Sequence, residues 1–430
     1  MGEPTGPAGA AGELRRRLGV FDAVVIGLGA MIGAGVFVAF GPAAEAAGSG
    51  LLLGLAVAGL VAYCNATSSA RLAARYPTSG GTYVYGRERL GDFWGYLAGW
   101  AFVVGKTASC AAMALTVGAY VWPSQAHPVA VGAVVALTAV NCAGVRKSAW
   151  FTRAVVAVVL AVLAAVVCAC LLSGPAEAAR LGIGAGAGPG GVLQAAGLLF
   201  FAFAGYARIA TLGEEVRDPA RTIPRAVPLA LGITLAVYAA VAVAALSVLG
   251  GAGLGGSTAP LADAVRAAGA GWLVPVVRTG AAAAAVGALM ALLLGVSRTV
   301  LAMARDRHLP HALAAVEPRF SAPRRAELAV GAVVLVIVLA GDVRGAIGFS
   351  SFGVLVYYAI ANASAWNLAT HTAPTTPSRR LRHVVPAVGL AGCVVLAGAL
   401  PGPSQRAGAA VLALGALAHL VRRAAAARAG

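Results

Sequence analysis

Long apolar runs separated by short polar segments are the feature that most constrains this chain of 430 residues. A helix that crosses a bilayer needs about 20 apolar residues. With 60% hydrophobic and only 11% charged residues, the chain exposes more apolar surface than a soluble domain can hide, and its runs are too long for the strands of a membrane barrel. We therefore expect an all-α polytopic membrane protein. The twelve runs lie at 20–40, 50–72, 94–121, 127–145, 154–173, 191–213, 226–250, 271–300, 327–341, 346–369, 383–400 and 406–421.

The net charge of +17 does not indicate a nucleic-acid partner, because the basic residues form short clusters between the runs. If the N-terminus faces the cytoplasm, 25 of the 32 basic residues lie on the cytoplasmic side and 4 on the opposite side. Cytoplasmic loops of membrane proteins carry this excess of Arg and Lys. The pattern predicts a multi-pass protein of the cell membrane with both termini cytoplasmic. Lys106, Arg208 and Arg278 lie within or near runs.

Glycines interrupt two of the runs. The first reads Ile-Gly-Leu-Gly-Ala-Met-Ile-Gly-Ala-Gly-Val-Phe over residues 26–37, and the sixth contains Phe-Ala-Gly-Tyr over residues 203–206. Glycines also let membrane helices pack closely, and Gly29 and Gly33 have the spacing for that. The breaks fall in the first and sixth runs, however, which is where two five-helix halves would place equivalent broken helices. Both interpretations stay open at this stage.

Four stretches occur in a fixed order along the chain. They are residues 33–37 (Gly-Ala-Gly-Val-Phe), 76–85 (Tyr-Pro-Thr-Ser-Gly-Gly-Thr-Tyr-Val-Tyr), 203–206 followed by 214–219 (Glu-Glu-Val-Arg-Asp-Pro), and 302–306 (Ala-Met-Ala-Arg-Asp). In these stretches the chain resembles bacterial amino acid permeases of the APC (amino acid–polyamine–organocation) superfamily, over nearly its whole length.

The resemblance implies a LeuT-like fold, in which five helices are followed by an inverted repeat of five more and by two peripheral helices. On this basis residues 19–173 form the first repeat and residues 188–371 the second. Residues 380–422 form the peripheral helices, between cytoplasmic tails at 1–18 and 423–430.

The interrupted runs also form the candidate substrate site. An amino acid carries a carboxylate and an ammonium, and burying either of them unpaired is costly. The free N–H groups of a half-helix that starts near Gly33 and Gly35 suit the carboxylate, since glycine leaves the backbone accessible. Carbonyls near Ala202 to Ala204 suit the ammonium, and the resemblance implies the same roles. Phe203 and Tyr206 are alternatively packing or lipid-facing aromatics. The candidates are Met31, Ile32, Gly33, Ala34, Gly35, Phe203, Ala204, Gly205 and Tyr206.

The residues around these breaks indicate the substrate class. Relatives that exchange cationic substrates often carry an acid just after the break in the sixth span, where this chain has Ala207. We therefore expect neutral amino acids, moved by secondary transport. An amino acid/polyamine antiporter and an amino-acid-sensing receptor on the same fold are the alternatives.

Coupling is a separate question. Some proton-coupled relatives carry a lysine in the fifth span, where this chain has Val159. Lys106, near the middle of the third run, is too far from either interface to snorkel, so we expect it to face the interior. There it either exchanges a proton or serves as a fixed cation in place of a coupling ion. Ser297 and Thr299 are possible sodium ligands, although hydroxyls in helices more often bond to their own backbone.

Two further segments have an expected role at the cytoplasmic side. Arg208 either forms a gate ion pair with Glu214 or Glu215 or extends to the membrane interface. The segment 76–91 is expected to be a re-entrant or amphipathic segment, or else a simple loop.

Other function classes lack support in the sequence. We find no paired acids or His/Asp cluster for an enzyme, since the ionisable residues within the runs are isolated and basic, and no polar rings for a channel. His308 and His311 are separated by Pro310 and have no third ligand nearby, so we expect no metal site. We also expect no cofactor, and partners limited to an amino acid substrate and membrane lipid. The oligomeric state is not predictable.

Overall fold

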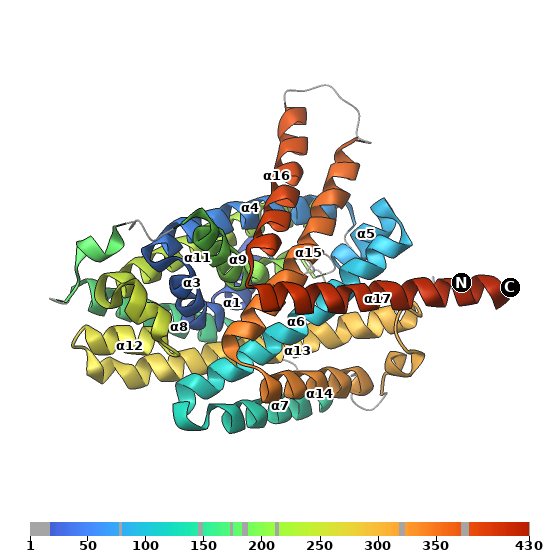
Figure 1. Cartoon of the computed structure of the whole chain (residues 1–430). Helices are drawn as coiled ribbons and strands as arrows, with labels where there is room; N and C mark the ends of the chain where they lie inside the picture. The colour runs from blue at the N-terminus through green and yellow to red at the C-terminus, as the bar shows by residue number, and fades with distance from the viewer. Residues whose placement is uncertain are drawn as a thin grey trace, which may run out of the picture.

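The computed structural model describes residues 18–76, 80–144, 149–172, 175–182, 188–210, 215–317, 323–370 and 378–429. Within these ranges the regular elements are all helices, and isolated bridge residues occur at Leu18, Val216 and Glu317. The all-α class predicted from the apolar runs is confirmed. Figure 1 shows the helices as one layered bundle.

The helices occupy all twelve predicted runs. Ten segments of the described chain are long and apolar enough to cross a membrane, while α14 and the apolar part of α16 are shorter. The α-helices are α1 (Val20–Met31), α2 (Gly35–Val38), α3 (Phe40–Ala47), α4 (Leu51–Arg75), α5 (Thr82–Leu90), α6 (Asp92–Val121), α7 (Ala126–Cys142), α8 (Ala149–Leu171), α9 (Pro189–Phe203), α10 (Ala207–Ala210), α11 (Pro219–Gly256), α12 (Pro260–Ala267), α13 (Val274–Arg305), α14 (Arg324–Ala340), α15 (Val343–Thr370), α16 (Ser378–Ala399) and α17 (Gly402–Ala429). The 3-10 turns are η1 (Gly48–Gly50), η2 (Pro123–Gln125), η3 (Ala178–Leu181), η4 (Ala204–Tyr206), η5 (Gly271–Leu273) and η6 (His311–Ala314).

The segment between the second and third spans is a short helix, α5, rather than a simple loop. Gly81 and Gly91 flank it with positive φ angles of 57° and 102°. Glycine adopts this conformation without the steric cost that a side chain would bring. The chain therefore turns sharply into and out of α5, which packs against α6 and α15.

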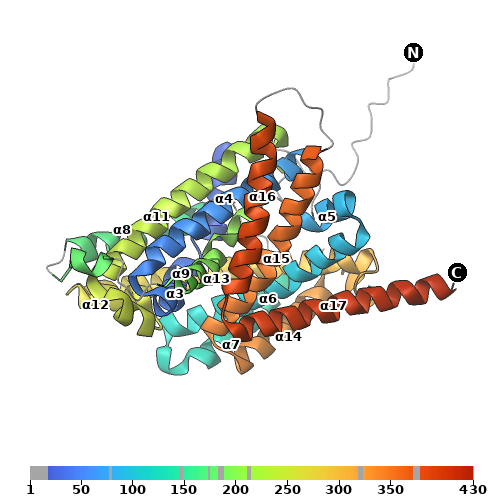
Figure 2. The ribbon, with the colours of Figure 1, turned by 45° about the horizontal axis from the view of Figure 1, so that its top comes forward.

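α6 occupies the middle of the bundle, where it packs against α13 and α15 (Figure 1). α7 and α14 lie side by side next to it. α17 packs against α6 and α15, and its C-terminal end extends beyond the bundle in both views (Figures 1 and 2). α17 continues as a helix to Ala429, beyond residue 422, where the last peripheral helix was expected to end, and the cytoplasmic tail stays a prediction. The division into two inverted repeats stays a prediction.

Candidate functional site

The first span breaks where its glycine pattern predicts. α1 ends at Met31, and Ile32 leaves the helix with φ −82° and ψ 56°. The new helical segment, α2, starts at Gly35 and continues through Ala39 into α3. Within the described chain, the backbone N–H groups of residues 33–36 donate to no acceptor. The break thus leaves four backbone donors without a backbone acceptor within the described chain.

The sixth span behaves differently from the prediction. α9 runs to Phe203, and residues 204–206 continue as the 3-10 turn η4 before α10 begins at Ala207. A 3-10 turn is a tightened helix rather than an unwound segment. The sixth span therefore changes from α-helix to 3-10 helix instead of unwinding. It has one glycine at this point, Gly205, where the first span has Gly33 and Gly35.

The two interrupted spans touch through their glycines. A Cβ atom added to Gly205 would lie 2.3 Å from the carbonyl oxygen of Ala30, and one added to Gly35 would lie 2.8 Å from the Cα of Ala202. Gly33 faces α13 instead, where an added Cβ would lie 2.9 Å from the Cβ of Ala288. A side chain at Gly33, Gly35 or Gly205 would therefore meet a neighbouring helix. These glycines allow close packing, which was the alternative interpretation.

A tyrosine joins the two breaks. The hydroxyl of Tyr238 on α11 lies 2.6 Å from the carbonyl oxygen of Met31 and 3.1 Å from that of Ala202. Both carbonyls end helical segments and have lost helical partners. Tyr238, fully buried among apolar neighbours, therefore fixes the relative position of the two segments.

Lys106 reaches the same region from the middle of α6. Its side chain is 7% exposed, and its Nζ donates a hydrogen bond of 3.2 Å to the carbonyl of Ala204. Tyr358 of α15 donates to the same carbonyl at 3.3 Å. Among the described residues no carboxylate forms an ion pair with Lys106. The expected interior position of Lys106 is confirmed. Its ammonium donates to a carbonyl that we had expected to bind the substrate ammonium.

The two aromatic candidates face the interior rather than lipid. Phe203 and Tyr206 are both fully buried. Phe203 packs on Tyr238 with 5.1 Å between ring centroids, and Tyr206 stacks on Tyr358 at 4.9 Å. The lipid-facing alternative is therefore wrong for both. Met31, Ile32, Ala34 and Ala204 are likewise buried, whereas the roles of all nine candidates in substrate binding stay predictions.

The interior also holds an acid that we did not predict. Glu327 on α14 is completely buried, and Ser297 of α13 donates to its Oε1 at 2.6 Å. The expectation that only basic residues lie within the spans was therefore wrong. Glu327 is the first residue of the ninth apolar run. That boundary position was the only feature of the sequence that could have indicated a buried acid. Thr299 bonds to the carbonyl of Gly295 in its own helix, which is the alternative that we gave for it.

Arg208 lies on α10 with its side chain exposed. One of its two predicted gate partners, Glu214, falls outside the described residues. The gate therefore stays a prediction.

Comparison with known proteins places these observations in a family. The model of the family described as "Amino acid permease" matches residues 18–414. An uncharacterized transporter of Mycobacterium tuberculosis is 71% identical over 98% of this chain and 95% of its own length. The branched-chain amino acid permease BcaP of Bacillus subtilis is 28% identical over 74% of this chain and 73% of its own. Cationic amino acid transporter 4 of Homo sapiens is 29% identical over 82% of this chain and 59% of its own.

Proposed function

Because the chain belongs to the amino acid permease family, within the APC superfamily, we propose that it is a secondary transporter of neutral amino acids in the cell membrane. It would work by alternating access, with the substrate held between the interrupted first and sixth spans. The observation that carries the choice of neutral substrates is the position of Lys106, whose ammonium contacts the carbonyl of Ala204 at the break.

A buried cation at this point acts against a cationic side chain. Two like charges 4 Å apart repel by about 4 kcal/mol at the effective dielectric of a protein surface, and Lys106 has no carboxylate partner within the described chain to offset its charge. Relatives are named for both branched-chain and cationic amino acids, so family membership alone leaves the class open. Lys106 and Ala207 both favour neutral substrates over cationic ones.

The positive charge of Lys106 would also attract the substrate carboxylate. The free N–H groups of residues 33–36 and the ammonium of Lys106 together present donors and positive charge to one region. For the substrate ammonium, the carbonyls of Met31 and Ala202 remain suitable, because each oxygen has a second lone pair beside the one that Tyr238 uses. The nine candidate residues thus offer a partner to each end of an amino acid.

We also propose that Lys106 is the coupling residue. It lies beside the proposed substrate site, and no carboxylate of the described residues pairs with it, so it either exchanges a proton during the cycle or substitutes for a coupling cation. The first case predicts proton-coupled uptake, and the second predicts exchange that needs no ion gradient.

Uptake into proteoliposomes tests substrate and coupling together. Leucine, alanine, arginine, lysine and a polyamine would be compared, each with an imposed proton gradient, an imposed sodium gradient, or internal amino acid alone. We expect uptake of neutral amino acids driven by protons or by exchange. Preferential uptake of arginine or a polyamine would overturn the substrate class, and binding without transport of any of them would favour a sensor.

Topology is tested by cysteine labelling in whole cells. The charge pattern predicts that Gln125→Cys and Arg406→Cys react with a membrane-impermeant maleimide from outside, and that Arg305→Cys reacts only after the cells are opened. All three side chains are exposed. Labelling of Arg305→Cys in intact cells would reverse the proposed orientation.

A further inference from the structure

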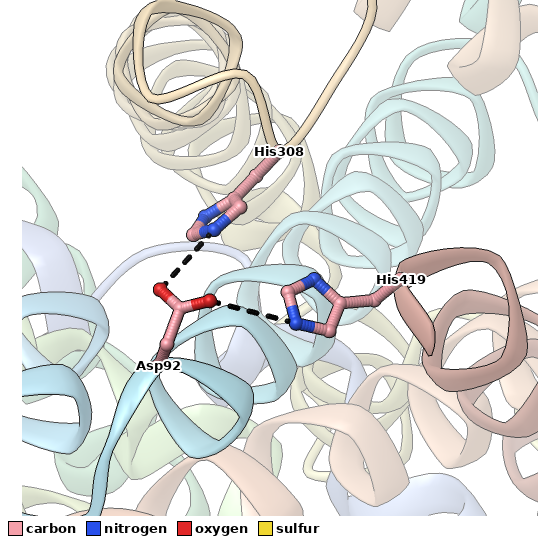
Figure 3. A group of neighbouring side chains, drawn as sticks. All are labelled: Asp92, His308 and His419. Atoms are coloured by element: carbon pink, nitrogen blue, oxygen red, sulfur yellow. Dashed lines mark ion pairs between the residues drawn. The ribbon is translucent and has the colours of Figure 1, made fainter. Parts of the chain in front are cut away.

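Three side chains that are far apart in the sequence meet at one end of the bundle, on the face that the charge pattern predicts to be cytoplasmic. Asp92 is the first residue of α6, His308 follows the end of α13, and His419 lies on α17. Figure 3 shows the two imidazoles pointing at different oxygens of the Asp92 carboxylate. The Nε2 atom of His308 is 3.4 Å from Oδ1, and that of His419 is 3.6 Å from Oδ2. All three potential ligand atoms lie within 4.8 Å of one another.

His419 supplies a buried nitrogen that makes no hydrogen bond within the described chain. Its side chain is only 6% exposed, and its Nε2 has no hydrogen-bond partner within the described chain. A buried polar atom without a partner is unfavourable. The plane of the ring is held by stacking on Tyr96, with 4.3 Å between centroids. Within the described chain, the nearest polar contact of this buried nitrogen is therefore Asp92 at 3.6 Å, which is longer than a hydrogen bond.

The neighbours of His308 determine which of its nitrogens carries a proton. Its Nδ1 lies 2.9 Å from the hydroxyl of Tyr83. That hydroxyl donates its only hydrogen to Asp306 at 2.5 Å, and the same carboxylate oxygen also accepts from Arg87 at 2.8 Å. Nδ1 of His308 must therefore donate to Tyr83, which in the neutral ring leaves a lone pair on Nε2.

That lone pair lies 3.4 Å from Oδ1 of Asp92, so a metal ion between the two atoms would be bound by both. A histidine whose second nitrogen donates to a fixed acceptor is the usual form of a metal ligand.

The spacing also fits a metal ion. Zinc bound tetrahedrally at about 2.0–2.1 Å requires ligand atoms roughly 3.3 Å apart. The two imidazole nitrogens lie 3.4 and 3.6 Å from different oxygens of Asp92. With one ligand atom from each residue, all separations are within 4.8 Å, so none needs to close by more than about 1.5 Å. Two imidazoles and one carboxylate suit zinc and its neighbours in the first transition series, whereas calcium and magnesium prefer oxygen ligands alone.

We propose that Asp92, His308 and His419 form a binding site for a divalent transition metal, with zinc as its reference ion. Asp92 is exposed, so water completes the coordination from the open side. The site is separate from the proposed substrate site, since Lys106 follows Asp92 on the same helix by fourteen residues, which is about 21 Å of helix. A bound ion joins α6, α17 and the segment after α13, so we expect it to stabilise the contact of α17 with the bundle.

The test is metal binding by the purified full-length protein, which does not depend on transport. The protein would carry no histidine tag and would be stripped with chelator. Zinc binding would be followed by isothermal titration and elemental analysis, and the geometry by the absorption of bound cobalt. We expect one zinc per chain, a tetrahedral cobalt spectrum and a raised unfolding temperature on adding zinc.

Matched variants assign the ligands. Asp92→Asn and His308→Ala should each weaken zinc binding at least tenfold, and His419→Gln should do the same with a side chain of similar size. His311→Ala removes an exposed histidine three residues from His308 and should leave binding unchanged. A wild-type protein that binds no zinc would overturn the proposal. Equal affinity in wild type and in folded Asp92→Asn would also overturn it, and would assign the ion to other groups such as the six cysteines.

Discussion

The centre of the bundle and the end that holds Asp92 build polar sites in opposite ways. Around Lys106 the partners are backbone carbonyls and tyrosine hydroxyls, all buried, in spans that approach one another through glycine. Around Asp92 the neighbours are ionisable side chains from α5, α6, α17 and the segment after α13, several of them exposed. The centre should therefore be sensitive to added volume and to the loss of one charge. At the Asp92 end, stability should depend more on charge than on volume, and the effect of each charge should be small.

The largest effect is expected from adding volume at the centre. Gly205→Val would place its Cβ against the backbone of Ala30, which cannot move without shifting α1. We expect a loss of stability of at least about 3 kcal/mol, or no folded protein. Gly232→Val on α11, where an added Cβ meets nothing within 4 Å, is the control. Thermal unfolding in detergent measures both, and equal unfolding temperatures would show that the close approach of the two spans is not required.

The second effect separates stability from function. Lys106→Met removes a charge whose insertion near the bilayer centre costs about 2.5–3.5 kcal/mol, so the variant should be at least as stable as the wild type. At every pH between 5 and 8, uptake by the variant should nevertheless be at least tenfold lower than uptake by the wild type. Lys147→Met, at the only other lysine, should transport normally. Unchanged uptake with an unchanged pH profile in Lys106→Met would limit Lys106 to packing.

A smaller effect is expected from a single hydroxyl at the centre. Tyr238→Phe leaves the ring in place but removes the donor to Met31 and Ala202. A lost hydrogen bond of this kind costs about 1 kcal/mol, and uptake should decline several-fold because the two interrupted spans lose their bridge. Tyr63→Phe, at a tyrosine that is 48% exposed, is the matched control. An identical response of the two variants would argue against the bridge.

The smallest effect is expected at the other end. Arg87 and Asp306 form an ion pair of 2.8 Å in which the two side chains are 36% and 38% exposed. Pairs this exposed contribute between zero and about 1 kcal/mol and are screened by salt. Arg87→Gln should therefore lower the unfolding temperature slightly at low salt and not at 1 M salt. A large, salt-independent loss would mean that this end of the bundle is as tightly constrained as the centre.

What could be predicted from the sequence follows the same division. Apolar run length gave the helices, and the paired glycines gave the break after Met31, because both signals are local. The interior position of Lys106 followed from its distance to either interface. The meeting of Asp92 with His419 depends on how α17 crosses α6, which no local pattern encodes. Glu327 was missed for a related reason, since its burial depends on the neighbouring α13 and not on its own run.

The burial of Lys106 makes it a natural reporter of opening. The chain has only two lysines, and at Lys106 the ammonium is enclosed and hydrogen-bonded. In a Lys147→Arg background, an amine-reactive reagent would have only Lys106 and the chain terminus as targets. The rate at which the reagent acylates Lys106, measured by mass spectrometry, then reports how often the middle of the bundle opens to water. Substrates and inhibitors can be ranked by how they change that rate, without a labelled substrate and without a reconstituted membrane.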